Sequence, residues 1–208
     1  MITVDKEYNR ANGLREGAGI STRYEAFFNI DPTTVAPGVI PSSKRSESVI
    51  EAINEIALEQ DIRDAEKEVN ITPTEAQKEA GNYKMGHVNI QGLDVSIENP
   101  KGSQRSGKDD TGQEWSVTLN NSYGYIKGTR GKDGDHVDVF IGDNPSSENV
   151  FVIDQINKDG SFDEHKVMLG FNSQAEAEAA YKSNYSEGWA GLGSVTPMTM
   201  DDFKAWVS

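Results

Sequence analysis

The sequence predicts a mainly β protein with peripheral helices, in which the strands form a β-barrel and a partly helical arm precedes them. Two observations predict this fold class. From residue 87 onward, short runs of alternating apolar and polar residues are separated by glycine-rich turns, which is typical of a barrel. Before residue 70, a segment with the helical spacing of apolar residues follows a stretch that has neither period. We therefore expect an arm with its helix over residues 1–70 and a barrel domain over residues 71–208.

The composition is that of a chain with one main core and no membrane segment. Of the 208 residues, 35% are hydrophobic, and no apolar run approaches the roughly 20 residues of a membrane helix. The N-terminus lacks the charged and then apolar pattern of a secretory signal, so we expect a cytoplasmic location. Cysteine is absent, which leaves histidines and carboxylates as the metal ligands.

The acidic charge balance narrows the choice of partners. A formal net charge of -14 argues against general nucleic-acid binding, which depends on lysine and arginine neutralising phosphates. A phosphate substrate remains compatible with this charge, because divalent cations held by carboxylates reverse the sign of the local field.

Residues 1–45 show neither helical nor strand periodicity and contain several glycines and prolines, so we interpret them as an irregular arm. The arm carries apolar side chains that a flexible linker would not need. These are Tyr24, Phe27, Phe28, Ile30, Val35, Val39 and Ile40. We expect an arm of this kind to order on a partner.

A long helix is predicted from about residue 48 to residue 69, with Ser48 and Glu51 as its capping box. One face of this helix is acidic, because four glutamates follow one another at i,i+4 spacing and repel one another weakly. These are Glu47, Glu51, Glu55 and Glu59. We favour a solvated face, and the alternative is a surface for docking a basic partner or for oligomerisation.

Three shorter helices are predicted from their caps. In each, a serine or threonine at the N-cap is followed three residues later by an acidic residue. The predicted ranges are 72–81, with Thr72 as the N-cap, 173–185 and 199–206.

The predicted strands are short and regularly spaced. The first two flank Gln91 and Gly92, which have the composition of a two-residue hairpin turn. The strand-like runs are 87–90, 93–97, 115–119, 125–127, 136–141, 150–156 and 162–171.

Three carboxylates, Asp133, Asp135 and Asp138, lie close together where a turn leads into an apolar strand. The alternation of that strand turns Asp138 away from its apolar neighbours, and a carboxylate against a packed surface is costly unless it is paired or bound to metal. Three such carboxylates also raise one another's pKa, so a divalent cation would compensate them. The alternative is a turn rich in glycine and aspartate, with its acids in solvent.

The run Tyr123-Gly-Tyr-Ile126, followed by Asp133-Gly-Asp-His-Val-Asp-Val139, resembles the signature of the soluble inorganic pyrophosphatases, whose motif reads D-x-D-P-h-D-h with h apolar. His136 stands where that family usually has proline. An acidic pair with a lysine and a Tyr-Lys pair follow in the family's order. They are Asp159 with Asp163 or Glu164 and Lys166, and then Tyr181 with Lys182. Residues 72–207 also resemble the pyrophosphatase-like domains of polyvalent proteins from bacteriophages and conjugative elements.

This resemblance implies an OB-type barrel that hydrolyses inorganic pyrophosphate with Mg²⁺, or with Mn²⁺ in its place. It implies metal ligation by Asp133, Asp135, Asp138, Asp159 and Glu164, with Asp163 as the alternative to Glu164. Asp135 would also contact the nucleophilic water. Contacts to phosphate oxygens would come from Lys166, Tyr123, Tyr181 and Lys182. Glu98 matches an early glutamate of the family, and Lys101 and Arg105 could supply its early cations.

Two functions follow from these expectations. The first is a hydrolase that removes pyrophosphate in the cytoplasm of a phage-infected or plasmid-bearing cell. The second is a non-catalytic virion or structural protein, in which the barrel is an assembly module and residues 1–70 dock onto phage structural proteins or onto another copy of the chain.

Overall fold

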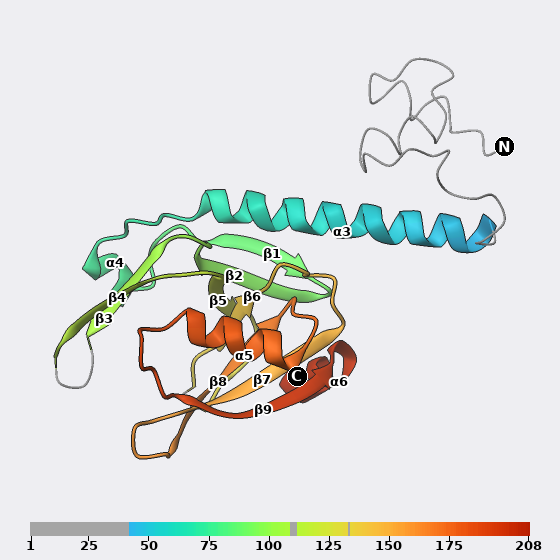
Figure 1. Cartoon of the computed structure of the whole chain (residues 1–208). Helices are drawn as coiled ribbons and strands as arrows, with labels where there is room; N and C mark the ends of the chain where they lie inside the picture. The colour runs from blue at the N-terminus through green and yellow to red at the C-terminus, as the bar shows by residue number, and fades with distance from the viewer. Residues whose placement is uncertain (1–41, 109–111, 133) are drawn as a thin grey trace. The chain divides into compact units, whose positions relative to one another are not determined.

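A computed structural model describes residues 42–108, 112–132 and 134–208 (Figure 1). The chain divides into two compact units, Met1–Glu51 and Ala52–Ser208, and every strand of the described residues lies in the second unit. An irregular arm was predicted for residues 1–45, and residues 1–41 of it lie outside the described residues. Within the described ranges, no helix is long and apolar enough to cross a membrane.

Helix α3, Ser42–Glu68, starts six residues before the predicted position. The predicted cap at Ser48 was therefore wrong, because neither glycine nor proline interrupts residues 42–68 and the helix continues in both directions. Its C-terminal half buries Ile62 and Ala65 in the main core, and Val69 follows them there. The compact unit with the strands begins inside this helix, at Ala52, and the domain boundary at residue 70 stays a prediction.

Helix α4, Glu75–Glu79, is shorter than predicted and has Thr74 as its N-cap instead of Thr72. The Thr74 hydroxyl accepts a hydrogen bond from the Gln77 amide, and the Gln77 side chain accepts one from the Thr74 amide. This reciprocal pair satisfies two backbone donors, which a cap at Thr72 would leave open. Thr72 instead donates its amide to the Asn70 side chain.

The mainly β prediction is confirmed by a mixed sheet of seven strands in the order β1-β2-β5-β6-β8-β7-β9. Strands β6 and β8 pair in parallel, and every other pair in this sheet is antiparallel. The seven strands are β1 Gly86–Ile90, β2 Leu93–Asn99, β5 Ser122–Ile126, β6 Val137–Ile141, β7 Asn149–Ile156, β8 Phe162–Leu169 and β9 Leu192–Thr199. Among the described residues the order runs from edge β1 to edge β9, and no closed barrel is detected.

Two strands were not predicted, namely β9 and β3, Gln104–Lys108. Strand β3 is polar and pairs with β4, Glu114–Thr118, in a separate two-stranded sheet. Strand β9 contains Pro197, which an edge strand tolerates because one of its sides needs no amide donors. Neither strand carries the period-2 apolar pattern on which the prediction depended.

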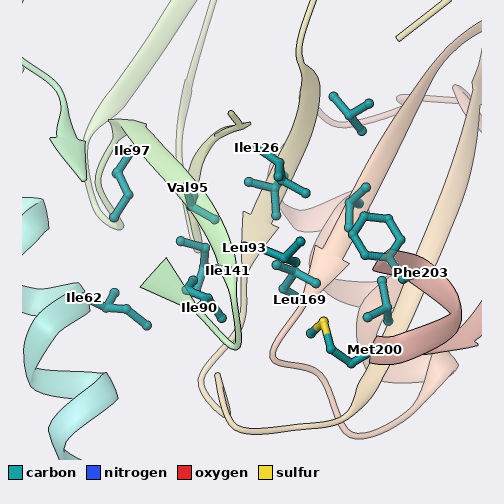
Figure 2. Packing of buried hydrophobic residues seen from close by; sticks show 14 of the residues in the cluster. Ile62, Ile90, Leu93, Val95, Ile97, Ile126, Ile141, Leu169, Met200 and Phe203 are labelled. Atoms are coloured by element: carbon teal, nitrogen blue, oxygen red, sulfur yellow. The ribbon is translucent and has the colours of Figure 1, made fainter. Parts of the chain in front are cut away.

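The two faces of the seven-stranded sheet bury different residues. One face forms the main core with α3 and with α6, Met200–Val207, and this core includes Ile141 and Leu169 of the sheet and Phe203 of α6 (Figure 2). The other face forms a second, aromatic cluster with α5, Gln174–Ser183. Because Val137, Val139 and Ile141 belong to the first face and Phe140 to the second, the prediction that Asp138 points away from its apolar neighbours is confirmed. The predicted helices near residues 173 and 199 are also confirmed, with their serine and threonine caps.

Candidate functional site

Lys166 is the centre of a polar network on the aromatic face of the sheet. Its side chain is 2% exposed, and its ammonium group forms ion pairs with Asp138 and with Glu164, the latter at 2.8 Å. It also donates to the Tyr123 hydroxyl at 3.1 Å. The parallel register of β6 and β8 sets Asp138 directly opposite Lys166. The three N–H donors of this buried lysine therefore have three partners, as a buried charge requires.

The surroundings keep Lys166 charged. Burial alone would lower the pKa of its ammonium group, but the charge of a Tyr123 phenolate, which forms only at high pH, and that of the Asp138 carboxylate together raise this pKa well above its ordinary value. The Tyr123 phenol has its own pKa raised, chiefly by burial, so it remains protonated and is a hydrogen-bond donor. It donates to Asp138.

Arg105 reaches this network from the separate hairpin of β3 and β4. Its guanidinium carbon lies 4.3 Å from the centroid of the Tyr123 ring, and Nη2 donates to the Tyr123 hydroxyl at 3.3 Å. The same guanidinium lies 5.7 Å from the Trp115 ring centroid. Two aromatic rings thus hold a second cation beside Lys166.

The carboxylates around Lys166 crowd one another. Burial, and then the charge of Asp138, raise the pKa of Glu98. Burial also raises the pKa of Glu164, and Asp138 and Asp163 add to this effect although Lys166 opposes it. Tyr83 donates to Glu98 at 3.2 Å, and burial together with that carboxylate raises the pKa of Tyr83 to about 12. Crowding of this kind is what an additional cation would relieve.

Sequence reasoning missed the residues that connect this network to α5. The Gln155 side chain on β7 contacts Asp163 and Glu164 through its nitrogen and the hydroxyls of Tyr181 and Tyr185 through its oxygen. The only signal in the sequence was a polar amide close to the apolar run Val150–Ile153 of β7, and it follows another polar residue, Asp154. Tyr83, Tyr185 and Trp189 offered no comparable signal, because aromatic residues near helix ends usually pack.

The structure brings together Glu98, Arg105, Tyr123, Asp138, Glu164, Lys166 and, through Gln155, Tyr181. Other predicted site residues make contacts elsewhere. Lys101 is exposed and pairs with Asp143 at 2.7 Å, and Lys182 is exposed on α5. Asp159 accepts hydrogen bonds from the Ser161 amide and hydroxyl at 2.9 and 2.6 Å, which lower its pKa.

The motif aspartate Asp135 lies in the bend before β6. Asp135 is exposed, and Asp133 lies outside the described residues. Next to Asp135, His136 donates a hydrogen bond from Nδ1 to the Thr129 carbonyl at 2.8 Å and stacks on Tyr125 with ring centroids 5.0 Å apart, so this imidazole packs against the sheet. Within residues 42–108, 112–132 and 134–208, no group of three or more histidine, aspartate or glutamate side chains is close enough to hold a metal ion.

This arrangement can bind an anion rich in oxygen atoms. Lys166 and Arg105 supply positive charge, the protonated phenol of Tyr123 supplies a donor, and all three side chains are largely withdrawn from solvent. In such an environment, charge interactions are stronger than in water.

Comparison with known proteins assigns the family. No curated protein sequence matches the chain. The model of the family described as Inorganic Pyrophosphatase matches residues 75–208, which is more than half of the chain and includes every strand and the whole polar network. The resemblance noted in the sequence is thereby confirmed, and the chain belongs to the inorganic pyrophosphatase family.

Proposed function

We propose that the chain is a Mg²⁺-dependent hydrolase of inorganic pyrophosphate. The observation that supports this most is the buried ammonium group of Lys166 between Asp138, Glu164 and Tyr123, in a chain of the pyrophosphatase family. These partners come from three neighbouring strands, β5, β6 and β8, so their positions are fixed before any substrate binds. Fixed charges of this kind stabilise a charged transition state without a reorganisation cost.

Substrate binding would be the role of the cations. Lys166 would exchange its bonds to Asp138 and Glu164 for bonds to phosphate oxygens, and Arg105 would offer its fork of N–H groups to the same substrate. Tyr123 would donate from its protonated phenol. By family resemblance, Tyr181 and Lys182 would contact the leaving phosphate, with Lys101 and Glu98 at the edge of the site.

The donor set is compatible with a hard divalent cation. We propose that Asp135, Asp138 and Glu164, with Asp133 and Asp159, hold Mg²⁺ or Mn²⁺, both of which prefer oxygen ligands. The fit is supported by Lys166, whose positive charge already lies between Asp138 and Glu164. When bound, such ions neutralise the substrate and lower the pKa of a water molecule enough to form hydroxide near neutral pH.

Asp135 is the residue that we propose to act on the attacking water. It is exposed in the bend before β6, three residues before Asp138 in the sequence, where it could accept a proton from that water. We further propose that the mixed sheet corresponds to the OB-type barrel of the family and that the enzyme acts in a phage-infected or plasmid-bearing cell.

A second candidate is a non-catalytic assembly module in a virion. It is favoured by two large apolar side chains on α3, Ile50 and Ile53, which are 57% and 48% exposed. Exposed apolar side chains on one helix suit a partner such as a phage structural protein or another copy of the chain.

Phosphate release by the purified chain distinguishes the two candidates. We expect the wild type to release phosphate from pyrophosphate with Mg²⁺ and to stop when the metal is chelated. Asp135→Asn should lower turnover by roughly a thousandfold or more while Mg²⁺ still raises the melting temperature, because the variant loses a group that acts in the transition state. A wild type that is stabilised by Mg²⁺ but releases no phosphate between about pH 6 and 9 would favour the assembly module instead.

A further inference from the structure

Gln155 is a buried amide at the point where the charged and aromatic parts of the network meet. Its side chain lies on β7 and the residue is 5% exposed. Its Nε2 donates to Asp163 Oδ2 at 2.9 Å and to Glu164 Oε1 at 3.0 Å. Its Oε1 accepts from the hydroxyls of Tyr181 and Tyr185, both at 2.8 Å. Both donors and both acceptor positions of the amide are therefore used.

We propose that Gln155 is a positioning residue for the hydrolytic site: it fixes the Glu164 carboxylate against Lys166 and directs the Tyr181 and Tyr185 hydroxyls away from that carboxylate and toward its own oxygen. This inference rests on the proposed function, since it assigns a role within the same site.

The carboxylate side of the argument concerns Glu164. One oxygen of this carboxylate, Oε1, accepts from both Gln155 Nε2 and Lys166 Nζ, the latter at 2.8 Å. Two donors on different strands thus determine where that oxygen lies. Without the amide, Glu164 would keep Lys166 but lose the donor that it shares with the neighbouring Asp163, and the two like charges would move apart.

The aromatic side of the argument concerns the phenols. The Tyr185 ring stacks on Trp189 with centroids 4.7 Å apart, and the Trp189 indole donates to the Tyr181 hydroxyl at 3.3 Å. Because the amide oxygen of Gln155 can only accept, both phenols are donors toward it. The segment after α5 is therefore joined to the charged network through one side chain.

Only an amide can donate to the two carboxylates and also accept from the two phenols at this position. An apolar side chain would remove one hydrogen-bond partner from each of two phenols and two carboxylates, and a charged glutamate would add a third carboxylate beside Asp163 and Glu164. Side chains that hydrogen-bond to metal ligands commonly contribute 10- to 100-fold to metal affinity or to activity, because they fix the orientation of the ligand.

The test compares Gln155→Met with Asn184→Leu in the full-length chain. Asn184 is a matched control because it is also a buried amide with four bonds, to the amides of Asn120 and Asn121, to the Asn121 side chain and to the Ala180 carbonyl. Among the contacts of the described residues, none joins these partners to Lys166 or to the carboxylates that pair with it, Asp138 and Glu164. Gln155→Asn, which keeps an amide but shortens its reach, is the second variant in case the methionine variant does not fold.

Two quantities are measured for each variant: the kcat and KM of pyrophosphate hydrolysis, and the affinity for Mn²⁺ alone by calorimetry. We expect Gln155→Met and Gln155→Asn to lower kcat by about 10- to 100-fold with KM within about threefold, and to weaken Mn²⁺ binding by about tenfold. Asn184→Leu should lower the melting temperature and change neither kcat nor Mn²⁺ affinity.

The outcomes separate the two proposals. If the wild type hydrolyses pyrophosphate and the Gln155 variants match it, or fall only as far as Asn184→Leu does, Gln155 is structural and the inference is overturned. If the wild type binds Mn²⁺ without hydrolysing pyrophosphate, the proposed function fails, and the Mn²⁺ affinities alone decide the role of Gln155. A wild type that does neither overturns both.

Discussion

The two faces of the seven-stranded sheet carry opposite kinds of residue although the same strands supply them. On β6 and β8, Val139 and Leu169 enter a core made entirely of apolar side chains, whereas Asp138 and Lys166 lie on the reverse face in a network of charges and phenols. The first face gains stability from burial in proportion to area, whereas the second buries charges that must be paired individually. The difference shows how strand alternation separates the part that holds the fold from the part that we propose to react.

Helix α3 offers the largest expected effect on the apolar face. Removing residues 1–51 should leave the compact unit folded, whereas removing residues 1–70 also removes Ile62, Ala65 and Val69 from the core. The longer deletion should be less stable than the shorter one by roughly 3 to 6 kcal/mol, because burying each of the two larger side chains contributes about 1.5 to 3 kcal/mol. Denaturant unfolding of both truncated chains measures the difference. Equal stabilities would mean that α3 does not contribute to the core.

Glu98 tests the charged face through pH. Burial and the charge of Asp138 raise the folded-state pKa of Glu98 above the ordinary value of 4.5. The protonated Glu98 therefore contributes to stability below pH 4.5, and this contribution is lost as pH rises through the folded-state pKa. Glu98→Gln should therefore become progressively more stable than the wild type as pH rises above 4.5. The free energy of unfolding of both proteins, measured as a function of pH, gives this difference.

Asp159 serves as the control because its shift has the opposite sign. Ser161 lowers its pKa below the ordinary value of 3.8, so its contribution is present above that pH and is lost on acidification. The Asp159→Asn variant should be less stable than the wild type at neutral pH, and this difference in the free energy of unfolding should disappear as pH falls. Parallel curves for Glu98→Gln and the wild type would mean that Glu98 is not held among the carboxylates of the network.

Lys101 should give the smallest effect, since its side chain and that of Asp143 are 53% and 81% exposed. Lys101→Ala should cost no more than about 1 kcal/mol of stability, as exposed ion pairs do, and should change pyrophosphate turnover by less than about threefold. Arg105→Ala, which removes a largely buried cation, should lower turnover by about 10- to 1000-fold. Similar losses in the two variants would mean that Lys101 contacts the substrate directly and does not only lie at the edge of the site.

What the sequence predicted correctly depended on local periodicity. The alternation of β6 determined the face on which Asp138 lies, and the threonine and serine caps determined the starts of α5 and α6. What it missed depended on pairings between distant parts of the chain. Gln155 meets Tyr181 and Tyr185, 26 and 30 residues away, because α5 packs on the same face of the sheet as that side chain. No local pattern encodes such a contact.

The turn between β7 and β8 shows the limits of spacing within a motif. Asp159 and Glu164, which we propose to share a metal site, make different contacts: Asp159 is bonded to Ser161 of its own turn, whereas Glu164 lies on the strand beside Lys166. A short polar side chain in a turn readily bonds to the backbone two residues further on, and this competes with a role elsewhere.

The central claim is that one face of the sheet carries the chemistry and the other the stability, and the neighbouring residues Asp138 and Val139 test it most directly. The measurement is kcat for pyrophosphate together with the free energy of unfolding, in Asp138→Asn and in Val139→Ala. We predict that Asp138→Asn lowers kcat by roughly a thousandfold, and that Val139→Ala keeps kcat within about threefold while it loses about 2 kcal/mol of stability. An Asp138→Asn variant that retains wild-type turnover would contradict the account.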